Sequence, residues 1–284
     1  MPIQLMTDGG ADIPERLSHE LAIRTVPLYL HFGTEEYKSD ALINGKTFNQ
    51  TMAESDKVPQ SSAASPHDYY QAFKQTDPAD PIIMLSLSRG LSTTYDNAVH
   101  AKQMLLEEEP DRQIEVINTK TASCGIALLL REAGTKLEEH YSYDQLRLHL
   151  HERVEQTNTL FVLKTLENLI LGGRLSRVKG TIAKTLSIKA LMKSDANGAI
   201  AVSEKVRGDK KAIRRFIEQI GESMKHAEGK MLTMSHYRTE ERAKSVLERI
   251  KQTYPFSDTH LAEMSPVIAT HAGEGGLVIS FFKD

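Results

Sequence analysis

The fold is decided by the stretch Pro81–Tyr95, which reads PIIMLSLSRGLSTTY. Its first seven residues, Pro81–Leu87, form a continuous apolar run, which is typical of a strand covered on both faces. A helical pattern follows over Leu91–Glu108, and the next apolar run, Gln113–Thr119, predicts another strand. A strand, a helix and a strand in this order predict a mainly parallel sheet with helices on both faces, which places the chain in the α/β class.

The same alternation extends on both sides of this stretch. Asp12 is expected to be the N-cap of an early helix, with Pro14 in its first turn and Glu15 completing a capping box. A second capping box is expected at Ser65–Asp68. The remaining elements expected in this half are the strands Ile3–Met6 and Thr25–Phe32 and the helices Ala122–His140 and Ser142–Gln156.

The second half has a different pattern. Asn197-Gly198 lies between the apolar runs Ser187–Lys193 and Ala199–Lys205, and Asn-Gly is a strong signal for a hairpin. A short helix is expected to end at Gly172-Gly173. Helices are expected at Asp209–Met224 and Thr239–Tyr254, and strands at Leu160–Lys164, Met231–Ser235, His260–Met264 and Gly276–Phe282. Hairpins mixed with helices predict an α+β domain with a mixed sheet, so we expect domains at residues 1–158 and 159–284.

The composition excludes several classes of protein. With 284 residues, two domains are the natural expectation. The net charge of −3, from 35 basic and 38 acidic residues, gives no footprint for nucleic acid. The single cysteine, Cys124, excludes an internal disulfide and favours a reducing, cytoplasmic compartment. No apolar run is long enough to cross a membrane, and the first residues favour a strand over a signal peptide.

Four turns rich in Ser, Thr and Gly are expected to form one polar pocket. They are Thr7–Asp12, Ser61–Pro66, Ser88–Tyr95 and Ser265–Val278, and the last places His271 in a glycine-dense turn. Loops that follow the carboxyl ends of strands in a doubly wound sheet form its ligand crevice. Hydroxyls and amides there would bind an anionic oxygen, although each Ser or Thr taken alone also suits a helix cap.

Other chemistries have no motif in this sequence. It has no P-loop, no dinucleotide fingerprint, no nucleophile elbow, no H-E-x-x-H zinc motif and no cysteine pair, so we expect no metal and no cofactor. Cys124 is interpreted as a buried packing residue rather than a thiol nucleophile. Asp8 and Asp12 suit either acid–base work or turn and cap positions.

The spacing of these turns resembles the DegV family of bacterial lipid-binding proteins, which includes the fatty-acid-binding subunits of fatty acid kinase. The similar segments run along nearly the whole chain. They are Thr7–Pro14 (family pattern T-D-S-x-A-D-L-P), Val58–Pro66 (V-P-x-T-S-Q-P-S-P), Ser88–Tyr95 (S-S-G-L-S-G-T-Y), Val116–Gly125 (V-I-D-S-x-x-A-S-x-G), Leu166–Leu175 (L-E-x-L-x-x-G-G-R-I) and Pro266–Gly275 (P-V-I-x-T-H-x-G-P-G).

The resemblance implies a two-domain DegV-like fold with a long-chain fatty acid in an apolar tunnel between the domains. It implies a binding protein without catalysis that presents the fatty acid carboxylate to a separate ATP-binding kinase subunit. The residues that it assigns to the carboxylate end are Ser61, Ser62, Ser92, Arg174 and His271, and the hydroxyl of Thr93 is expected at the same edge of the sheet. A basic stretch with Lys205, Arg207, Lys210 and Lys211 is similar to one in kinase-binding members and is expected to contact the kinase.

The chain departs from the family pattern beside the expected head-group site. Arg89 replaces a serine and Thr93 a glycine, while Asn118 replaces an aspartate and Glu274 a proline. Two alternatives therefore stay open. One is an enzyme that acts on a small acyl or phosphoryl substrate with His271 as general acid or base. The other is a lipid-responsive regulatory protein without a kinase partner. Transient contact with a membrane is compatible with any of the three.

Overall fold

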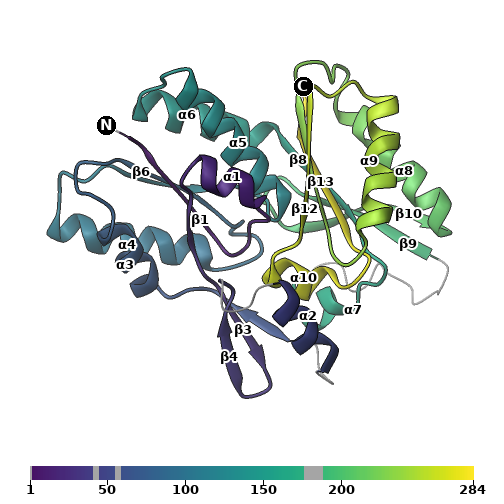
Figure 1. The fold of residues 1–284 in the computed structure, drawn as a ribbon, viewed down its shortest axis with the longest axis horizontal. Coiled ribbons are helices and arrows are strands. Elements are labelled where there is room, and N and C mark those ends of the chain that lie inside the picture. The colour runs from purple at the N-terminus through teal and green to yellow at the C-terminus, as the bar shows by residue number, and fades with distance from the viewer. Residues whose placement is uncertain (1, 41–44, 55–58, 176–187) are drawn as a thin grey trace.

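The computed structural model describes residues 2–40, 45–54, 59–175 and 188–284. Val58 and Ser187, which belong to segments discussed above, lie outside these residues. Figure 1 shows the first and second halves of the chain lying side by side, each built around its own sheet. Within the described residues, the strands form sheets of four, six and three strands.

The four-stranded sheet confirms the parallel α/β architecture expected for the first half. Its strand order is β2-β1-β6-β7 and every pairing is parallel. Helices α3 and α4 pack on one face and α5 on the other (Figure 1). The elements are β1 Gln4–Asp8, α1 Glu15–Glu20, β2 Arg24–Val26, α3 Pro66–Lys74, β6 Ile82–Ser86, α4 Thr94–Glu108, β7 Ile114–Asn118, α5 Cys124–Glu138 and α6 Tyr143–Gln156. All five residues of β6 are buried, as its apolar run predicted.

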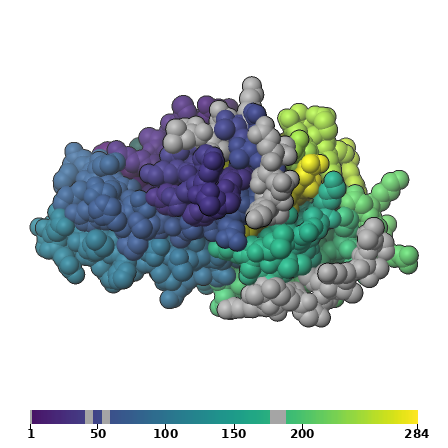
Figure 2. Space-filling model, turned by 90° about the horizontal axis from the view of Figure 1, so that it is seen from below, coloured from purple at the N-terminus to yellow at the C-terminus, as the bar shows by residue number. Residues whose placement is uncertain are grey.

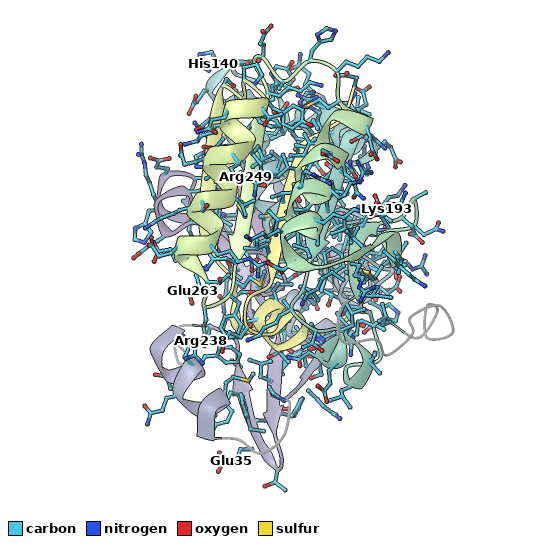
Figure 3. The ribbon with its side chains drawn as sticks, turned by 90° about the vertical axis from the view of Figure 1, so that its right-hand side faces the viewer. Glu35, His140, Lys193, Arg238, Arg249 and Glu263 are labelled. Carbon is cyan, nitrogen blue, oxygen red and sulfur yellow. The ribbon has the colours of Figure 1, made fainter. Side chains whose placement is uncertain are left out.

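The six-stranded sheet confirms the mixed sheet expected for the second half. Its order is β10-β9-β8-β13-β11-β12, in which only β11 and β12 are parallel among the pairings described. The elements are β8 Thr157–Val162, α7 Glu167–Leu171, β9 Ile188–Ser194, β10 Ile200–Arg207, α8 Asp209–Ser223, β11 Met231–His236, α9 Glu240–Thr253, β12 Asp258–Glu263, α10 Pro266–Ala272 and β13 Leu277–Phe282. Helices α8 and α9 lie side by side over the outer face, where Figure 3 labels Arg249 on α9.

A small third sheet corrects one prediction. The single strand expected over Thr25–Phe32 is two strands in different sheets, because Pro27 lies between them and has no N–H group to donate to a ladder. The small sheet has the order β4-β3-β5, with β3 Tyr29–Phe32, β4 Glu35–Lys38 and β5 Gln60–Ser62, and helix α2 Gly45–Glu54 lies in the same region. Figure 2 shows this underside of the molecule, where the two halves meet.

Helix α5 joins the two large sheets into one structure. It packs against β6 of the four-stranded sheet and against β8, β11 and β13 of the six-stranded sheet. Its residues Cys124–Leu130 are all buried, as expected for a helix that is apolar on every side. A single hydrophobic core therefore continues from the first half onto the inner face of the second sheet, where it includes Met192 and Val278.

Several helix starts differ from the sequence prediction. Ser65 forms the capping box that was predicted for α3, and Ser142 forms a capping box at the start of α6 that was not predicted. Asp12 does not cap α1, whose N-cap is Pro14, because the Asp12 carboxylate accepts hydrogen bonds from Ser123 Oγ and from the Ser265 N–H instead. The helix expected from Leu91 begins three residues later, at Thr94.

The prediction of a glycine-dense turn around His271 is also wrong, because His271 lies on helix α10. Ser265 caps this helix through its side chain and Pro266 occupies the first helical position. Proline suits that position because its missing N–H would have no partner there. Gly273, with φ of 69°, ends the helix after His271.

Candidate functional site

A cavity lies between the two halves of the chain and collects most of the turns singled out in the sequence. The space inside it and at its mouth measures about 890 Å³, with open solvent at the mouth included. Most of the wall is apolar. The apolar residues come from both halves: Leu28, Ala63, Leu87, Leu91, Ala122, Phe161, Leu163, Leu169, Ile200, Val267, Ile268, Ala272 and Val278.

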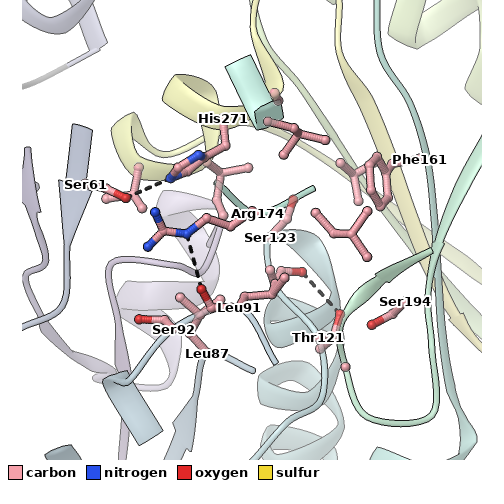
Figure 4. Close-up of a pocket in the computed structure, with 18 of the residues that line it drawn as sticks. Ser61, Leu87, Leu91, Ser92, Thr121, Ser123, Phe161, Arg174, Ser194 and His271 are labelled. Atoms are coloured by element: carbon pink, nitrogen blue, oxygen red, sulfur yellow. Dashed lines mark hydrogen bonds between the residues drawn. The ribbon is translucent and has the colours of Figure 1, made fainter. Parts of the chain in front are cut away.

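The polar end of the cavity is shown in Figure 4. Thr121, Ser123, Thr159 and Ser194 also line the cavity. Ser61 Oγ from β5 and His271 Nε2 from α10 lie 2.7 Å apart, although 210 positions separate them in the sequence. Arg174, just after α7, donates from Nε to the Leu91 carbonyl at 3.3 Å and from Nη1 to the Gly172 carbonyl at 2.7 Å. The structure therefore brings a hydroxyl, an imidazole and a guanidinium group together at this end of the cavity.

His271 is held neutral by its surroundings. Burial, together with the positive charge of Arg174, lowers the pKa of His271 to about 4. Its Nδ1 atom is buried and has no hydrogen-bond partner among the described residues. The imidazole is therefore neutral at pH 7, so one ring nitrogen can donate a hydrogen bond and the other can accept one.

Arg174 is a half-buried cation without a carboxylate partner among the described residues. Burial lowers the pKa of its guanidinium group, yet arginine stays charged at neutral pH. Its only described acceptors are the Leu91 and Gly172 carbonyls, which carry no full charge. Because desolvating a charge is costly unless it is paired, this end of the cavity favours an anionic ligand group.

The three serines predicted for the site lie at the cavity. Ser61, Ser62 and Ser92 all line the cavity, together with Arg174 and His271. Ser92 Oγ is 2.6 Å from Thr94 Oγ1 and accepts the Thr94 N–H at the start of α4, so it also acts as a local cap. Ser62 Oγ lies 2.9 Å from His31 Nε2, a contact that the sequence did not indicate.

A second, outer pocket opens at the polar end. It shares Ser61, Ser92 and Arg174 with the inner cavity and adds Thr93 and Arg89. Thr93 is exposed and lines only this outer pocket, so it lies in the mouth rather than in the cavity.

The sequence did not identify the apolar residues of the cavity wall. Phe161 on β8 and Val278 on β13 face the cavity from the second sheet, and Ile200 lies at the start of β10. An apolar residue that lines a cavity cannot be told from a core residue by sequence pattern, because both fill the same alternating positions of a strand. No local signal in the sequence would have distinguished them.

The surroundings of Cys124 support its interpretation as a packing residue. It is buried, and burial raises the pKa of its thiol to about 11. Its Sγ contacts the Thr233 and Val278 carbonyls at 3.5 Å. Among the described residues, no group of three histidine, cysteine or acidic side chains has the arrangement of a metal site.

Asp8 and Asp12 stabilise the turns around the cavity. The Asp8 carboxylate accepts the Gly10 and Leu87 N–H groups, and Asp12 links the first half to α10 through Ser265. Burial raises the pKa of each carboxyl to about 6. Neither aspartate lines the cavity, so the structure favours the turn interpretation over acid–base work.

The basic stretch lies at the junction of β10 and α8. Lys205, Arg207, Lys210 and Lys211 are all exposed. Arg207, Lys210 and Lys211 form no ion pair with another described residue, whereas Arg215, one helical turn on, is bound by Glu204, Glu218 and Glu222.

Comparison with known proteins identifies the family. Residues 2–284 match a family model described as "Uncharacterised protein, DegV family". A DegV domain-containing protein of Streptococcus pyogenes serotype M1 is 30% identical over 283 residues, which cover 99% of both chains. The chain belongs to the DegV family.

Solved DegV structures share the fold over its whole length. One is a DegV family protein from Ruminococcus gnavus refined with vaccenic acid, with a TM-score of 0.92, 26% identity and 99% of each chain covered. Another is the Streptococcus pneumoniae Fatty Acid Kinase B3 protein loaded with linoleic acid, with a TM-score of 0.89, 26% identity and the full length of each chain covered. Other solved DegV proteins, from Thermotoga maritima, Streptococcus agalactiae and Thermus thermophilus, are named for the lipid or fatty acid that they bind.

Within the described residues of this DegV protein, helices fall short of the length and apolarity needed to span a membrane.

Proposed function

We propose that this chain binds a long-chain fatty acid in the cavity between its halves and presents the carboxylate to a separate kinase, which forms an acyl phosphate. The acyl chain lies against the apolar wall, where each buried methylene contributes about 0.8 kcal/mol. The carboxylate lies at the polar end and accepts hydrogen bonds from Ser61, Ser92, Arg174 and His271, with Ser62 and Thr93 nearer the mouth.

Arg174 is the observation that carries this proposal. A half-buried guanidinium without a carboxylate partner in the described chain favours an anion, and most of the remaining cavity wall is apolar. A fatty acid combines the two. The fatty acids bound to the related structures from Ruminococcus gnavus and Streptococcus pneumoniae support the same ligand class.

Native ligand analysis tests the proposal. Lipid extracted from the denatured protein and examined by mass spectrometry is expected to contain a long-chain fatty acid. The variant Arg174→Gln is expected to bind fatty acid at least about tenfold more weakly, because a hydrogen bond to a charged group contributes about 1.5–3 kcal/mol. Arg214→Gln, which lies exposed on α8, is a matched control. A purified protein that contains no lipid and takes up no added fatty acid would contradict the proposal.

An enzyme that uses His271 as general base has weaker support. The Ser61–His271 pair has the spacing of a nucleophile and its base. However, His271 Nδ1 has no partner among the described residues to orient the ring, and a pKa of about 4 makes the imidazole a weak base. Turnover of an activated acyl ester by the isolated chain would favour this alternative.

The kinase contact is proposed on the exposed basic stretch Lys205, Arg207, Lys210 and Lys211. This stretch ends β10 at the same end of the sheet as α7 and α10. The register pairs Arg207 with Ile188, and the neighbouring Lys189 donates to the Lys164 carbonyl near α7. A kinase with an acidic surface would therefore dock close to the end of the molecule that holds His271.

Charge reversal separates the kinase proposal from ligand binding. The double variant Arg207→Glu with Lys211→Glu is expected to keep its affinity for fatty acid and to lose kinase-dependent phosphorylation. The wild-type contact is expected to weaken as salt is added. Full phosphorylation by the reversed protein would exclude this surface and favour a lipid-responsive regulatory role.

A further inference from the structure

Arg89 is a cation at the mouth that the proposed fatty acid site does not use. It lines the outer pocket but not the inner cavity, and its side chain is 63% exposed. Arg174 and Ser92 line both spaces, so the outer pocket lies next to the position proposed for the carboxylate.

The position of Arg89 is fixed from both its backbone and its side chain. The Arg89 N–H donates to Asn118 Oδ1 at 3.1 Å, and the same oxygen accepts the Lys120 N–H at 3.2 Å. Arg89 Nε is 3.0 Å from Asp96 on the first turn of α4. Asp96 therefore restrains the guanidinium through Nε, while Nη1 and Nη2 have no hydrogen-bond partner among the described residues.

The proposed reaction places new negative charge in this pocket. In the kinase-dependent step, a carboxylate oxygen attacks the terminal phosphorus of a nucleoside triphosphate. A P–O bond forms, the bond to the bridging oxygen breaks, and the nucleoside diphosphate leaves with the electron pair. The carboxylate has then become an acyl phosphate, whose phosphoryl oxygens extend beyond Arg174 into the outer pocket and carry more charge than the carboxylate did.

We propose that Arg89 binds the phosphoryl group of the acyl phosphate product, an inference that rests on the proposed function. The free Nη1 and Nη2 atoms match two phosphoryl oxygens in a bidentate arrangement. Helix α4 begins beside them, so the positive end of its dipole adds to the same field. Arg89 would thus retain the product on the chain and distinguish it from the unphosphorylated fatty acid.

A stable product analogue tests the role of Arg89 without the kinase. The probes are a long-chain fatty acid and the 2-oxoalkylphosphonate of the same chain length, in which CH₂ replaces the bridging oxygen. Arg89→Ser is expected to bind the fatty acid within about twofold of wild type and the phosphonate at least about tenfold more weakly. Arg89→Lys, which keeps a charge without the bidentate fork, is expected to fall between the two.

Arg147→Ser is the matched control, because Arg147 is a partly exposed arginine paired with a single aspartate, Asp144, on α6. It is expected to bind both probes as wild type does. If wild type binds neither probe, the proposed function is wrong. If wild type binds both probes and Arg89→Ser weakens neither, or weakens both equally, fatty acid binding stands and the role of Arg89 is overturned.

Discussion

Gly172 decides where the His271 ring can lie. A Cβ atom at Gly172 would stand 2.6 Å from His271 Nδ1 and 2.8 Å from its Cε1, closer than real contacts allow. The backbone of Gly172 has φ of −69° and ψ of −9°, which alanine adopts freely. The only obstacle to a side chain at Gly172 is therefore the neighbouring structure, with the imidazole nearest.

Gly172→Ala is expected to move the His271 ring and to weaken fatty acid binding. We expect a loss of stability of about 1–3 kcal/mol, the usual cost of overpacking a well-filled site. Urea unfolding and fatty acid titration measure the two effects. In the His271→Ala background the same change is expected to cost much less, because the ring that it meets is gone. Equal costs in both backgrounds would show that the two residues are independent.

Stability is expected to depend on pH through His271. In the unfolded chain this histidine takes up a proton with the ordinary pKa of 6.5, whereas in the folded chain its pKa is about 4. The unfolded state therefore holds more protons between these values, and His271 lowers the stability as pH falls from 6.5 to 4. Asp8 and Asp12, whose pKa values burial raises from 3.8 to about 6, have the opposite effect in that window.

Comparing wild type with His271→Gln isolates the histidine, because both proteins keep the two aspartates. Between pH 7 and pH 4 the difference in unfolding free energy is expected to shift by about 3 kcal/mol in favour of the variant. Urea unfolding at a series of pH values gives this difference. Curves that stay parallel over the whole range would mean that His271 titrates normally in the folded protein.

Helix α5 is the element on which both sheets depend. Leu129 in its middle is fully buried, between the sheets that α5 contacts. Leu129→Ala is expected to lower the unfolding free energy by about 2–5 kcal/mol. The space left by the removed side chain cannot be filled easily, because the two sheets hold α5 in place. Leu148 on α6 is 56% exposed and serves as the control, with an expected change within about 0.5 kcal/mol. A cost at Leu129 as small as that at Leu148 would contradict this role for α5.

At the level of elements, the sequence predicted what local signals specify. Apolar runs such as Pro81–Leu87, the Ser65 capping box and the Asn197-Gly198 hairpin all have local causes, and the structure contains each of them. The failed prediction for Asp12 depends on distant partners. The type and position of Asp12 suit a helix cap, but its carboxylate accepts hydrogen bonds from Ser123 and Ser265 instead.

The composition of the turns predicted a shared polar pocket, but only the family resemblance assigned Arg174 to it. Ser61 and His271 meet across 210 positions, and no periodicity connects them. The small sheet that carries Ser61 was missed, because β3 and β5 are short and pair with each other across the polar segment between them. Phe161 was missed for a different reason, since nothing in a strand pattern separates a cavity wall from a core.

At the scale of the whole molecule, the two halves share too much structure to be independent. The hydrophobic core continues from α5 to the six-stranded sheet. Hydrogen bonds also connect the two halves. Asp12 accepts the Ser265 N–H at 2.8 Å, Ser88 Oγ donates to the Gly198 carbonyl at 2.8 Å, and the Ser194 hydroxyl donates to the Lys120 carbonyl at 2.8 Å. We propose that residues 1–158 and 159–284 are domains in topology that fold as one unit.

The full-length chain is therefore expected to unfold in a single transition, and residues 1–158 alone are expected not to form a stable fold. The fragment would leave one side of α5 without the second sheet, and an apolar helix face of that size in water favours association or a loose state. Circular dichroism during heating, together with binding of a hydrophobic dye, compares the fragment with the full chain. The fragment is expected to bind the dye and to melt without a cooperative step, while the full chain melts cooperatively and gains stability from added fatty acid, by about 2.7 kcal/mol at a ligand concentration 100 times Kd. A fragment that melts cooperatively and binds no dye would show that α5 needs only its own sheet, and the cavity would then lie between two bodies able to separate.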